Sequence, residues 1–358
     1  MKRLGAILIA LLLAAEAFAC TTAIVTAGAS RSGRPLLWKQ RDASDPYNVI
    51  AGVSGGKYAF TGLFPTSDTL HTKCYAGINE AGFAIINNIS YNLRPDSLGF
   101  DTHAGLLMSR ALAECATVEE FLQLLDSEPI PKGLSTNFGV ADSRGGAAYF
   151  EAGDSTFVRY DVPDGDILFR TNFSLSGDPS RGRGQTRYET MEMLTEPPGL
   201  FDPSFFLNTG RSFIKDGHDW LHGAKTLLET DFIPRTTSVS SIVIECPVRE
   251  GERGLMWCAT GYTPCCYAIL AVQGEPLPQA LQGDANLASV ELFKRVHDGK
   301  TLDVRQIRKI MRVVRSAERK ELRRGGRLIR SGINADSVRK YNEGADKRFV
   351  RFKKRLAL

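Results

Sequence analysis

Hydrophobic positions along the chain follow two patterns, which predict alternating blocks of strands and helices. Short runs rich in β-branched and aromatic residues are typical of strands. Such runs occur at “TTAIVTA”, “LLWKQRD”, “CYAGINEAGFAIINNIS”, “NFGVADSRG”, “GAAYFEAG”, “STFVRYDV”, “DILFRTNFS”, “SVSSIVIECP”, “GLMWCATG” and “YAILAVQG”. The third run is expected to hold two strands joined by a turn at Asn79–Gly82.

Longer amphipathic stretches predict the helices. “HAGLLMSRALAECATVEEFLQLLDS” contains two, and Thr117 is a suitable N-cap for the second because Glu120 follows at capping-box spacing. Further helices are predicted over 184–195 and 218–229, and the chain turns helical from about residue 285. Strand-rich blocks with helices between them predict an α+β fold, in which packed antiparallel sheets are flanked by helices.

The first residues have the pattern of a secretory signal peptide. Lys2 and Arg3 precede an apolar stretch, and Ala17-x-Ala19 supplies the small residues of a cleavage site. The stretch is short for a membrane span, and no later run reaches about 18 apolar residues. We therefore expect signal peptidase to remove residues 1–19 and the mature protein to be periplasmic or extracellular.

Positive charge is concentrated near the C-terminus. Residues 291–358 carry 22 Lys+Arg against 8 Asp+Glu, although the whole chain has a net charge of only +5. We expect one core over 20–285 and a basic helical extension over 286–358 packed on it. Export argues against a nucleic-acid partner, so the extension is interpreted as a solvated helical layer. Contact with an anionic surface such as lipid headgroups, or docking between subunits of a homo-oligomer, are the alternatives.

The seven cysteines do not form an obvious disulfide framework. Most lie in apolar sequence, such as “LMWCATGY” and “PCCYAIL”, which predicts buried thiols. The chain has no CxxC motif and no histidine pair at metal-ligand spacing. We therefore expect no metal and no organic cofactor.

Cys20 becomes the first residue when the leader is cleaved after Ala19. It could then be a lipid anchor, a structural thiol or a catalytic nucleophile. A lipid anchor needs an aliphatic residue three positions before the cysteine and a small residue two positions before it, where this chain has Ala17 and Phe18. A tether also usually follows the cysteine, whereas here a strand is expected at once. A nucleophile is favoured because a free α-amine, with a pKa of about 7.7–8.0, can accept the proton of a thiol with a pKa of about 8.5.

Four of these runs in order, “CTTAIV”, “LLWKQRD”, “GINEAGFAIINNIS” and “DILFRTNFS”, resemble the cysteine N-terminal nucleophile (Ntn) hydrolases. This family includes choloylglycine hydrolase, penicillin V acylase, acid ceramidase and the acyl-CoA:isopenicillin N acyltransferase branch. The resemblance extends over most of residues 20–275 and implies the family's four-layer αββα sandwich, in which two packed antiparallel sheets are flanked by helices. It also implies hydrolysis of a linear amide without a cofactor.

The resemblance assigns roles to individual residues. Cys20 matches the nucleophile, and Asp42 matches the aspartate that orients the α-amine. Asn172 matches the asparagine whose side-chain amide binds the oxyanion, and Asn88, or the backbone beside it, matches the second oxyanion contact. Instead of these catalytic roles, Asp42 could be a turn residue at the end of its strand. Asn172 could simply cap the turn after its strand.

Positive residues complete the resemblance. The family has Arg-Asn-x-Asp where this chain has “KQRD”, so the family's arginine aligns with Lys39, and Arg41 could take over part of its role. Arg235, in “IPRTTSVSS”, matches a late arginine of the family. Instead of belonging to the site, Lys39 and Arg235 could be ordinary surface charges.

The sequence therefore predicts an exported amidohydrolase that cleaves a C–N amide bond of a small N-acyl compound through a Cys20 acyl-thioester. The alternatives are an acyltransferase that passes the acyl group to an amine acceptor, and a non-catalytic lipoprotein that acts as a binding module. Loops around 44–70 and 91–103 are expected to select the substrate, whose identity the sequence does not give.

Overall fold

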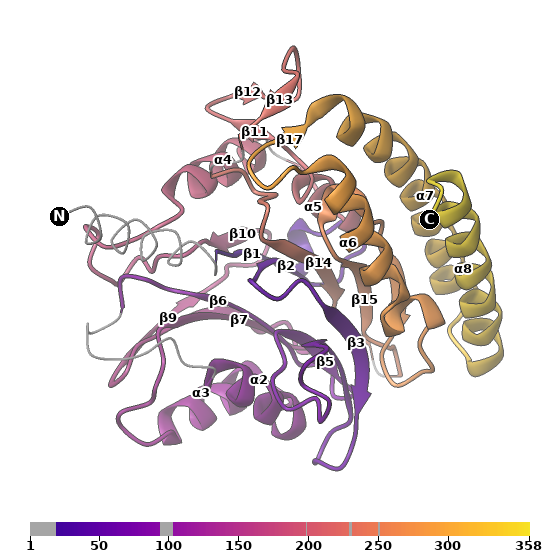
Figure 1. Ribbon diagram of the computed structural model, residues 1–358. Coiled ribbons are helices and arrows are strands. Elements are labelled where there is room, and N and C mark those ends of the chain that lie inside the picture. The colour runs from indigo at the N-terminus through magenta and orange to yellow at the C-terminus, as the bar shows by residue number, and fades with distance from the viewer. Residues whose placement is uncertain (1–18, 94–102, 198, 229–230, 250) are drawn as a thin grey trace.

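The computed structural model describes residues 19–93, 103–197, 199–228, 231–249 and 251–358 (Figure 1). Two antiparallel sheets are stacked face to face at the centre of the molecule, and helices cover their outer faces. In Figure 1 the long C-terminal helices lie on one side and a shorter helical pair lies on the opposite side.

The first sheet has six strands in the order β10-β1-β2-β14-β15-β16, and every neighbouring pair is antiparallel. Its strands are β1 (Thr21–Val25), β2 (Leu36–Asp42), β10 (Ile167–Arg170), β14 (Ser238–Glu245), β15 (Leu255–Thr260) and β16 (Ile269–Val272). Strand β1 has a partner on each side, so the residue that precedes it enters the interior of the fold rather than an edge.

The second sheet has seven strands, and their spatial order is their order in the chain. They are β3 (Asn48–Val53), β4 (Phe60–Pro65), β5 (Ala76–Asn79), β6 (Ala84–Ile89), β7 (Thr136–Ala141), β8 (Ala147–Ala152) and β9 (Phe157–Asp161). Gly82 takes a positive φ of 84° in the predicted turn between β5 and β6, a conformation that glycine adopts without a Cβ penalty.

Helices α2 (His103–Glu114) and α3 (Val118–Ser127) cover the outer face of the second sheet. Thr117 caps α3 as predicted, since its side chain accepts a hydrogen bond of 3.1 Å from the backbone nitrogen of Glu120. Phe121 of α3 packs edge-on against Phe138 and Phe150, which anchors the helix to the sheet.

The remaining helices cover the first sheet. They are α4 (Gln185–Thr195), α5 (Pro203–Thr209), α6 (Asp284–Val296), α7 (Val304–Ser331) and α8 (Ala335–Arg355). The smaller elements are η1 (Ala27–Ala29), η2 (Thr263–Cys265), η3 (Gln279–Gln282), β11 (Ile214–Lys215), β12 (His218–Asp219), β13 (Thr226–Leu227) and β17 (Leu302–Asp303). The helical, basic C-terminal region is therefore present as the sequence predicts.

The hydrophobic core has two parts. Ile24 of the first sheet and Ile86 of the second are fully buried in the larger cluster, which also contains Trp38, packed on Phe206 of α5, and extends to Phe349 of α8. The smaller cluster lies between the second sheet and helices α2 and α3. The four layers confirm the predicted α+β sandwich of two packed antiparallel sheets flanked by helices. Within the described residues, no helix is long and apolar enough to cross a membrane.

Two local predictions are wrong. The described part of 218–229 forms β12 and β13 rather than a helix, and Gly223 between them has a positive φ of 79°, which interrupts a helix. Residues 44–70 are not simply a loop, because β3 and β4 lie within them. The second expected substrate loop, 91–103, lies largely outside the described residues.

Candidate active site

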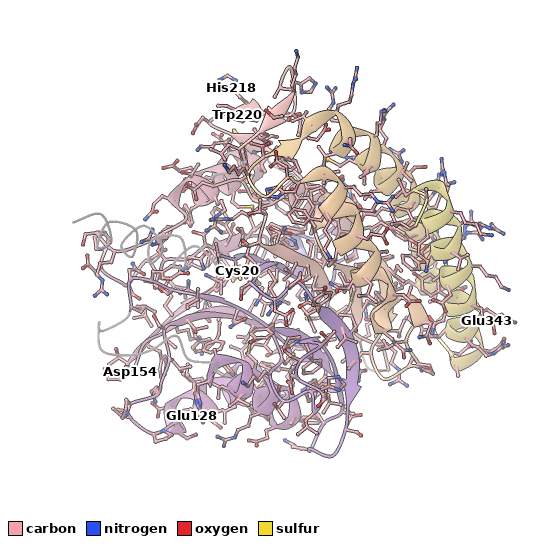
Figure 2. All side chains as sticks on the ribbon, in the orientation of Figure 1. Cys20, Glu128, Asp154, His218, Trp220 and Glu343 are labelled. Carbon is pink, nitrogen blue, oxygen red and sulfur yellow. The ribbon has the colours of Figure 1, made fainter. Side chains whose placement is uncertain are left out.

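Cys20 lies directly before β1 and is 7% exposed. Its backbone nitrogen donates a hydrogen bond of 2.8 Å to the side-chain oxygen of Asn172, and its Sγ lies 4.0 Å from the backbone oxygen of Asp42. Three residues that the sequence places far apart therefore meet at one point. Figure 2 shows Cys20 at the centre of the molecule, between the layers.

Asn172 follows the end of β10 and is fully buried. Its Nδ2 donates to the backbone oxygen of Ile89 at 2.9 Å, while its Oδ1 accepts from Cys20 and from Arg187. A side-chain amide held at both ends has a fixed orientation, which is what a hydrogen-bond donor for a developing charge needs.

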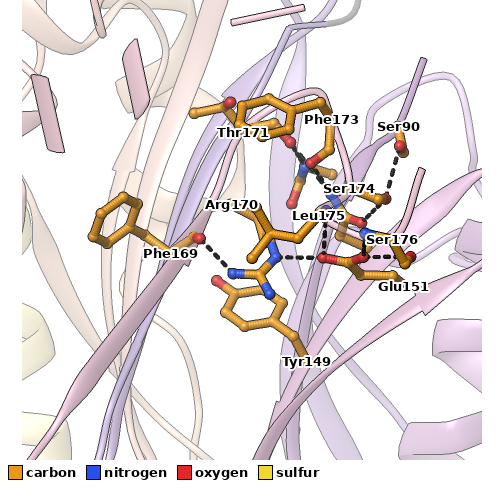
Figure 3. A network of polar contacts seen from close by, with 12 residues as sticks. Ser90, Tyr149, Glu151, Phe169, Arg170, Thr171, Phe173, Ser174, Leu175 and Ser176 are labelled. Atoms are coloured by element: carbon orange, nitrogen blue, oxygen red, sulfur yellow. Dashed lines mark hydrogen bonds and ion pairs between the residues drawn. The ribbon is translucent and has the colours of Figure 1, made fainter. Parts of the chain in front are cut away.

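The turn after β10 is fixed by the buried ion pair between Arg170 and Glu151, which Figure 3 shows. The Nε of Arg170 lies 2.7 Å from a Glu151 carboxylate oxygen, and the same carboxylate accepts the backbone nitrogens of Leu175 and Ser176 at 2.9 and 2.7 Å. The turn that carries Asn172 is thus tied to β8 on both sides of the asparagine.

Asp42 ends β2 and is buried. Its Oδ1 accepts a hydrogen bond of 2.5 Å from the hydroxyl of Ser238, while its buried Oδ2 has no hydrogen-bond partner among the described residues. Burial raises the pKa of this carboxyl to about 6, against the opposing effect of the charges on Arg235 and Arg187. One carboxylate oxygen is therefore available for another donor beside Cys20.

Arg235 reaches this cluster through β14 and its preceding turn. Its backbone nitrogen donates to Ser238 Oγ at 2.9 Å, and its guanidinium lies 3.6 Å from the carboxylate of Asp231. Its charge also opposes protonation of Asp42. The structure therefore brings Arg235 to the same site as Cys20 and Asp42, and it is only 9% exposed.

Arg187, which sequence reasoning missed, holds the site from α4. Its Nη1 donates to the backbone oxygen of Cys20 at 2.7 Å and to the hydroxyl of Thr21 at 3.1 Å, and its Nη2 donates to Asn172 Oδ1 at 2.9 Å. Arg187, Thr190 and Met191 form the buried face of α4. The sequence of α4 has no apolar stripe, so no local signal marks Arg187 as buried.

Lys39 of β2 is buried within electrostatic range of the same thiol. Its Nζ donates to Asn87 Oδ1 at 2.5 Å and lies 5.4 Å from the ring centre of Tyr75. Burial lowers the pKa of Lys39 to about 8, and the negative charge of a Cys20 thiolate opposes this shift. Arg41 instead donates to Asn48 Oδ1 at 2.6 Å.

Asn88 is buried next to the site, but its side chain has structural contacts. Its Oδ1 accepts from the hydroxyl of Thr22 at 2.8 Å, and its Nδ2 donates to the backbone oxygen of Thr171. The side chain therefore ties β6 to β1 and to the turn before Asn172. The second oxyanion contact assigned to Asn88, or to the backbone beside it, stays a prediction.

Tyr91 was also missed by sequence reasoning. Its backbone nitrogen donates to the backbone oxygen of Asn172 at 3.1 Å. Burial raises the pKa of its hydroxyl to about 12, with a further contribution from the charge of Cys20. Tyr91 thus lies within electrostatic range of the thiol, three positions after Asn88 in “NNISYN”.

All seven cysteines are free and buried, as the sequence predicts. Burial raises the pKa of Cys74, Cys115 and Cys266 to about 12 and the pKa of Cys246 and Cys258 further still. These five thiols are therefore neutral near pH 7 and poor nucleophiles. Cys20 differs from them in its position before β1, where Arg187 binds its backbone oxygen and Asn172 its backbone nitrogen.

One family model matches part of the chain. Residues 46–194 match the family model described as acyl-coenzyme A:6-aminopenicillanic acid acyl-transferase. The matched range contains Asn88, Asn172 and Arg187, and it begins after Cys20 and Asp42. A comparison with curated protein sequences gives no match.

Two solved structures share its outline. Penicillin V acylase from Agrobacterium tumefaciens aligns with 70% of this chain and 86% of its own, at 16% identity and a TM-score of 0.41. A mutant of conjugated bile acid hydrolase from Clostridium perfringens aligns with 67% of this chain and 89% of its own, at 12% identity and a TM-score of 0.43. The chain is therefore similar over residues 46–194 to the acyl-transferase family that the model describes.

Proposed function

We propose that the chain is an exported amidohydrolase, which uses the thiol of Cys20 to cleave the C–N bond of a small N-acyl amide. The thiol becomes active once the leader has been removed by cleavage after Ala19. The observation that carries the proposal is the environment of the Cys20 nitrogen. This nitrogen lies 2.8 Å from Asn172 Oδ1, and the adjacent Asp42 has a buried carboxylate oxygen without a hydrogen-bond partner among the described residues.

Removal of residues 1–19 would turn the Cys20 nitrogen into an α-amine that has two acceptors available. Asn172 Oδ1 accepts one of its hydrogens already, and Asp42 Oδ2 offers the second acceptor. An amine held in this way takes the thiol proton as the sulfur attacks the substrate carbonyl carbon, and it becomes an α-ammonium. The nucleophile thus has a general base on the same residue.

The sulfur attack forms an S–C bond and moves the carbonyl electron pair onto oxygen. The Asn172 amide is the predicted donor to this oxyanion, and Lys39 and Arg187 add positive charge around the reacting sulfur. The α-ammonium then gives its proton to the departing amine while the C–N bond breaks. Water attacks the remaining acyl-thioester with the amine again as base, which releases the carboxylic acid and restores the thiol.

Mass spectrometry of the protein secreted by a bacterial host is the first test, since the mechanism requires a chain that starts at unmodified Cys20. The secreted protein is then assayed against a panel of N-acyl amino acids, acylated aminopenicillanic acid and conjugated bile salts, with release of the free amine as the readout. Cys20→Ala is expected to abolish turnover of any substrate found.

Cys115→Ala is the matched control. It removes a buried thiol at the end of α2, so turnover is expected to match that of the unsubstituted chain. Turnover that survives in Cys20→Ala, or a diacylglyceryl mass on Cys20, would contradict the mechanism. The lipid mass would favour the lipoprotein alternative.

The acyltransferase alternative shares every step up to the acyl-thioester. It is favoured by the description of the family model that residues 46–194 match. The two reactions are separated by adding a second amine to the assay. A hydrolase yields the free acid at an unchanged rate, whereas an acyltransferase yields the new amide in proportion to the acceptor.

A further inference from the structure

The charges of α7 are sorted between its two faces. All eleven of its Lys and Arg side chains are exposed: Arg305, Arg308, Lys309, Arg312, Arg315, Arg319, Lys320, Arg323, Arg324, Arg327 and Arg330. None of the eleven forms an ion pair among the described residues. A helix of 28 residues is about 42 Å long, so these side chains form one long positive surface.

The two acidic residues of α7 cannot neutralise this surface because both are buried and already paired. Glu318 binds the guanidinium of Arg211 at 2.6 and 2.5 Å and accepts the backbone nitrogen of Ala268 at 3.0 Å. Glu321 binds Arg348 at 2.7 Å and the hydroxyl of Tyr341 at 2.6 Å. Figure 2 shows nitrogen-tipped side chains projecting outward from these helices.

The positive surface is hollowed rather than smooth. A recess of about 590 Å³ lies between α7 and α8, and its walls include Arg323, Arg324 and Arg327 of α7 and Arg351 of α8. A larger recess of about 1450 Å³ lies along the first half of α7, and it is also lined by α7 arginines. Acidic residues on the rim of the larger recess serve as turn and helix caps; Asp298, for example, accepts the backbone nitrogens of Lys300 and Thr301 at 2.8 and 2.7 Å.

The floor of the recess between α7 and α8 has a different character from its walls. Tyr267, Val313, Ala317 and Phe352 line it with apolar surface. The hydroxyl of Tyr267, a residue that is only 3% exposed, has no hydrogen-bond partner among the described residues.

We propose that the exposed face of α7 and the adjoining recess of α8 dock onto the headgroups of an anionic phospholipid bilayer. Charge complementarity supports this partner, because each Lys or Arg near an anionic leaflet contributes about 1 kcal/mol to binding. The apolar floor and basic walls suit an amphiphile whose phosphate meets the arginines while its glycerol and upper acyl segments reach the floor.

A nucleic acid is the other polyanion that a basic helix could bind, and the structure favours it less. The exposed face of α7 presents no aromatic side chain on which a base could stack and only Gln306 as an amide that could read a base edge. Its arginines also line separate recesses rather than one groove that follows a phosphate backbone.

The test is co-sedimentation of the full chain with vesicles of phosphatidylcholine alone and of an equimolar mixture with phosphatidylglycerol. We expect binding to the mixed vesicles only, and binding should weaken as salt is added. The variant Arg312→Gln, Arg319→Gln, Arg323→Gln, Arg330→Gln is expected to bind at least about 10-fold more weakly.

A matched control loses the same four charges elsewhere: Lys57→Gln, Arg144→Gln, Arg249→Gln, Arg253→Gln. These four side chains are exposed and none lies on α7, so this variant should bind as the unsubstituted chain does. Unchanged melting temperatures and circular dichroism show that each variant is folded; if the α7 variant does not fold, the pair Arg312→Gln, Arg323→Gln replaces it. Equal loss in both quadruple variants, binding to phosphatidylcholine alone, or tighter binding to a DNA duplex than to mixed vesicles would overturn the proposal.

Discussion

Replacing Lys39 by methionine tests whether the structure describes the electrostatics of the site correctly. Lys39 is 1% exposed, and burial lowers its pKa from 10.5 to about 8. Between these two values the unfolded chain keeps the proton on Lys39 and the folded chain does not. The free energy of unfolding must therefore rise with pH across this window. The stability gained in this way is lost again as the pH falls to about 8.

The size of the effect follows from the shift. A difference of about 2.5 pKa units, at 1.36 kcal/mol per unit, corresponds to about 3 kcal/mol. Relative to Lys39→Met, the unsubstituted chain should gain this amount of stability between pH 8 and pH 10.5. Below pH 8 the charged lysine is buried at a cost, which its contacts with Asn87 and Tyr75 offset only in part.

Urea unfolding at a series of pH values measures this difference directly. Lys39→Gln is the matched control, because glutamine keeps a donor for Asn87 but does not titrate. The two variants should differ from each other by a constant amount, and each should differ from the unsubstituted chain by an amount that changes with pH. A difference that is the same from pH 7 to pH 11 would refute the conclusion that Lys39 is desolvated beside Cys20.

Three further outcomes follow from the same site. Arg187→Lys removes the guanidinium whose two Nη atoms hold Cys20 and Asn172 together. With any substrate found, kcat should fall about 10- to 100-fold, while the melting temperature should change little. With the leader attached, burial raises the pKa of Asp42 to about 6, and the α-ammonium of the cleaved chain should lower this pKa. The value of kcat/KM should therefore fall at a pH below about 6, because the protonated carboxyl no longer holds the amine, and Asp42→Asn should lack this acidic limb. Glu151→Ala leaves the Arg170 guanidinium buried without its partner and should cost about 3 kcal/mol in urea unfolding, whereas an effect below 1 kcal/mol would contradict the burial of the pair.

Local signals in the sequence mark part of the candidate site. Cys20 is marked by the leader before it, Asp42 ends a predicted strand, and Asn172 follows one. Strand and helix periods were sufficient to predict most of the strands and the basic helices, but not β3 and β4. These features depend on neighbours within about ten residues, which is the range over which a pattern can be interpreted.

Contacts across the fold could not be predicted in this way. Arg187 resembles a surface residue of a polar helix until the helix is packed on the sheet, where its guanidinium meets Cys20 and Asn172. The failed helix over 218–229 has the same origin, since His218–Asp219 pairs with β11 and Thr226–Leu227 pairs with β17. Tertiary packing overrode the local preference in both places.

Asp42 links maturation to stability on the proposed mechanism. With residues before Cys20 attached, the carboxylate has one buried oxygen without a hydrogen bond, and its pKa is raised because the folded state disfavours the charge. Cleavage behind Ala19 creates an ammonium group next to that oxygen, and the two charges satisfy each other. The cleavage that produces the catalytic amine would therefore also give the buried Asp42 carboxylate its missing partner. A chain that keeps an extra residue before Cys20 should be inactive, and it should also be less stable than the cleaved chain. Equal stability of the two forms would mean that Asp42 finds its partner elsewhere, and the amine would then lack the acceptor that the mechanism assigns to it.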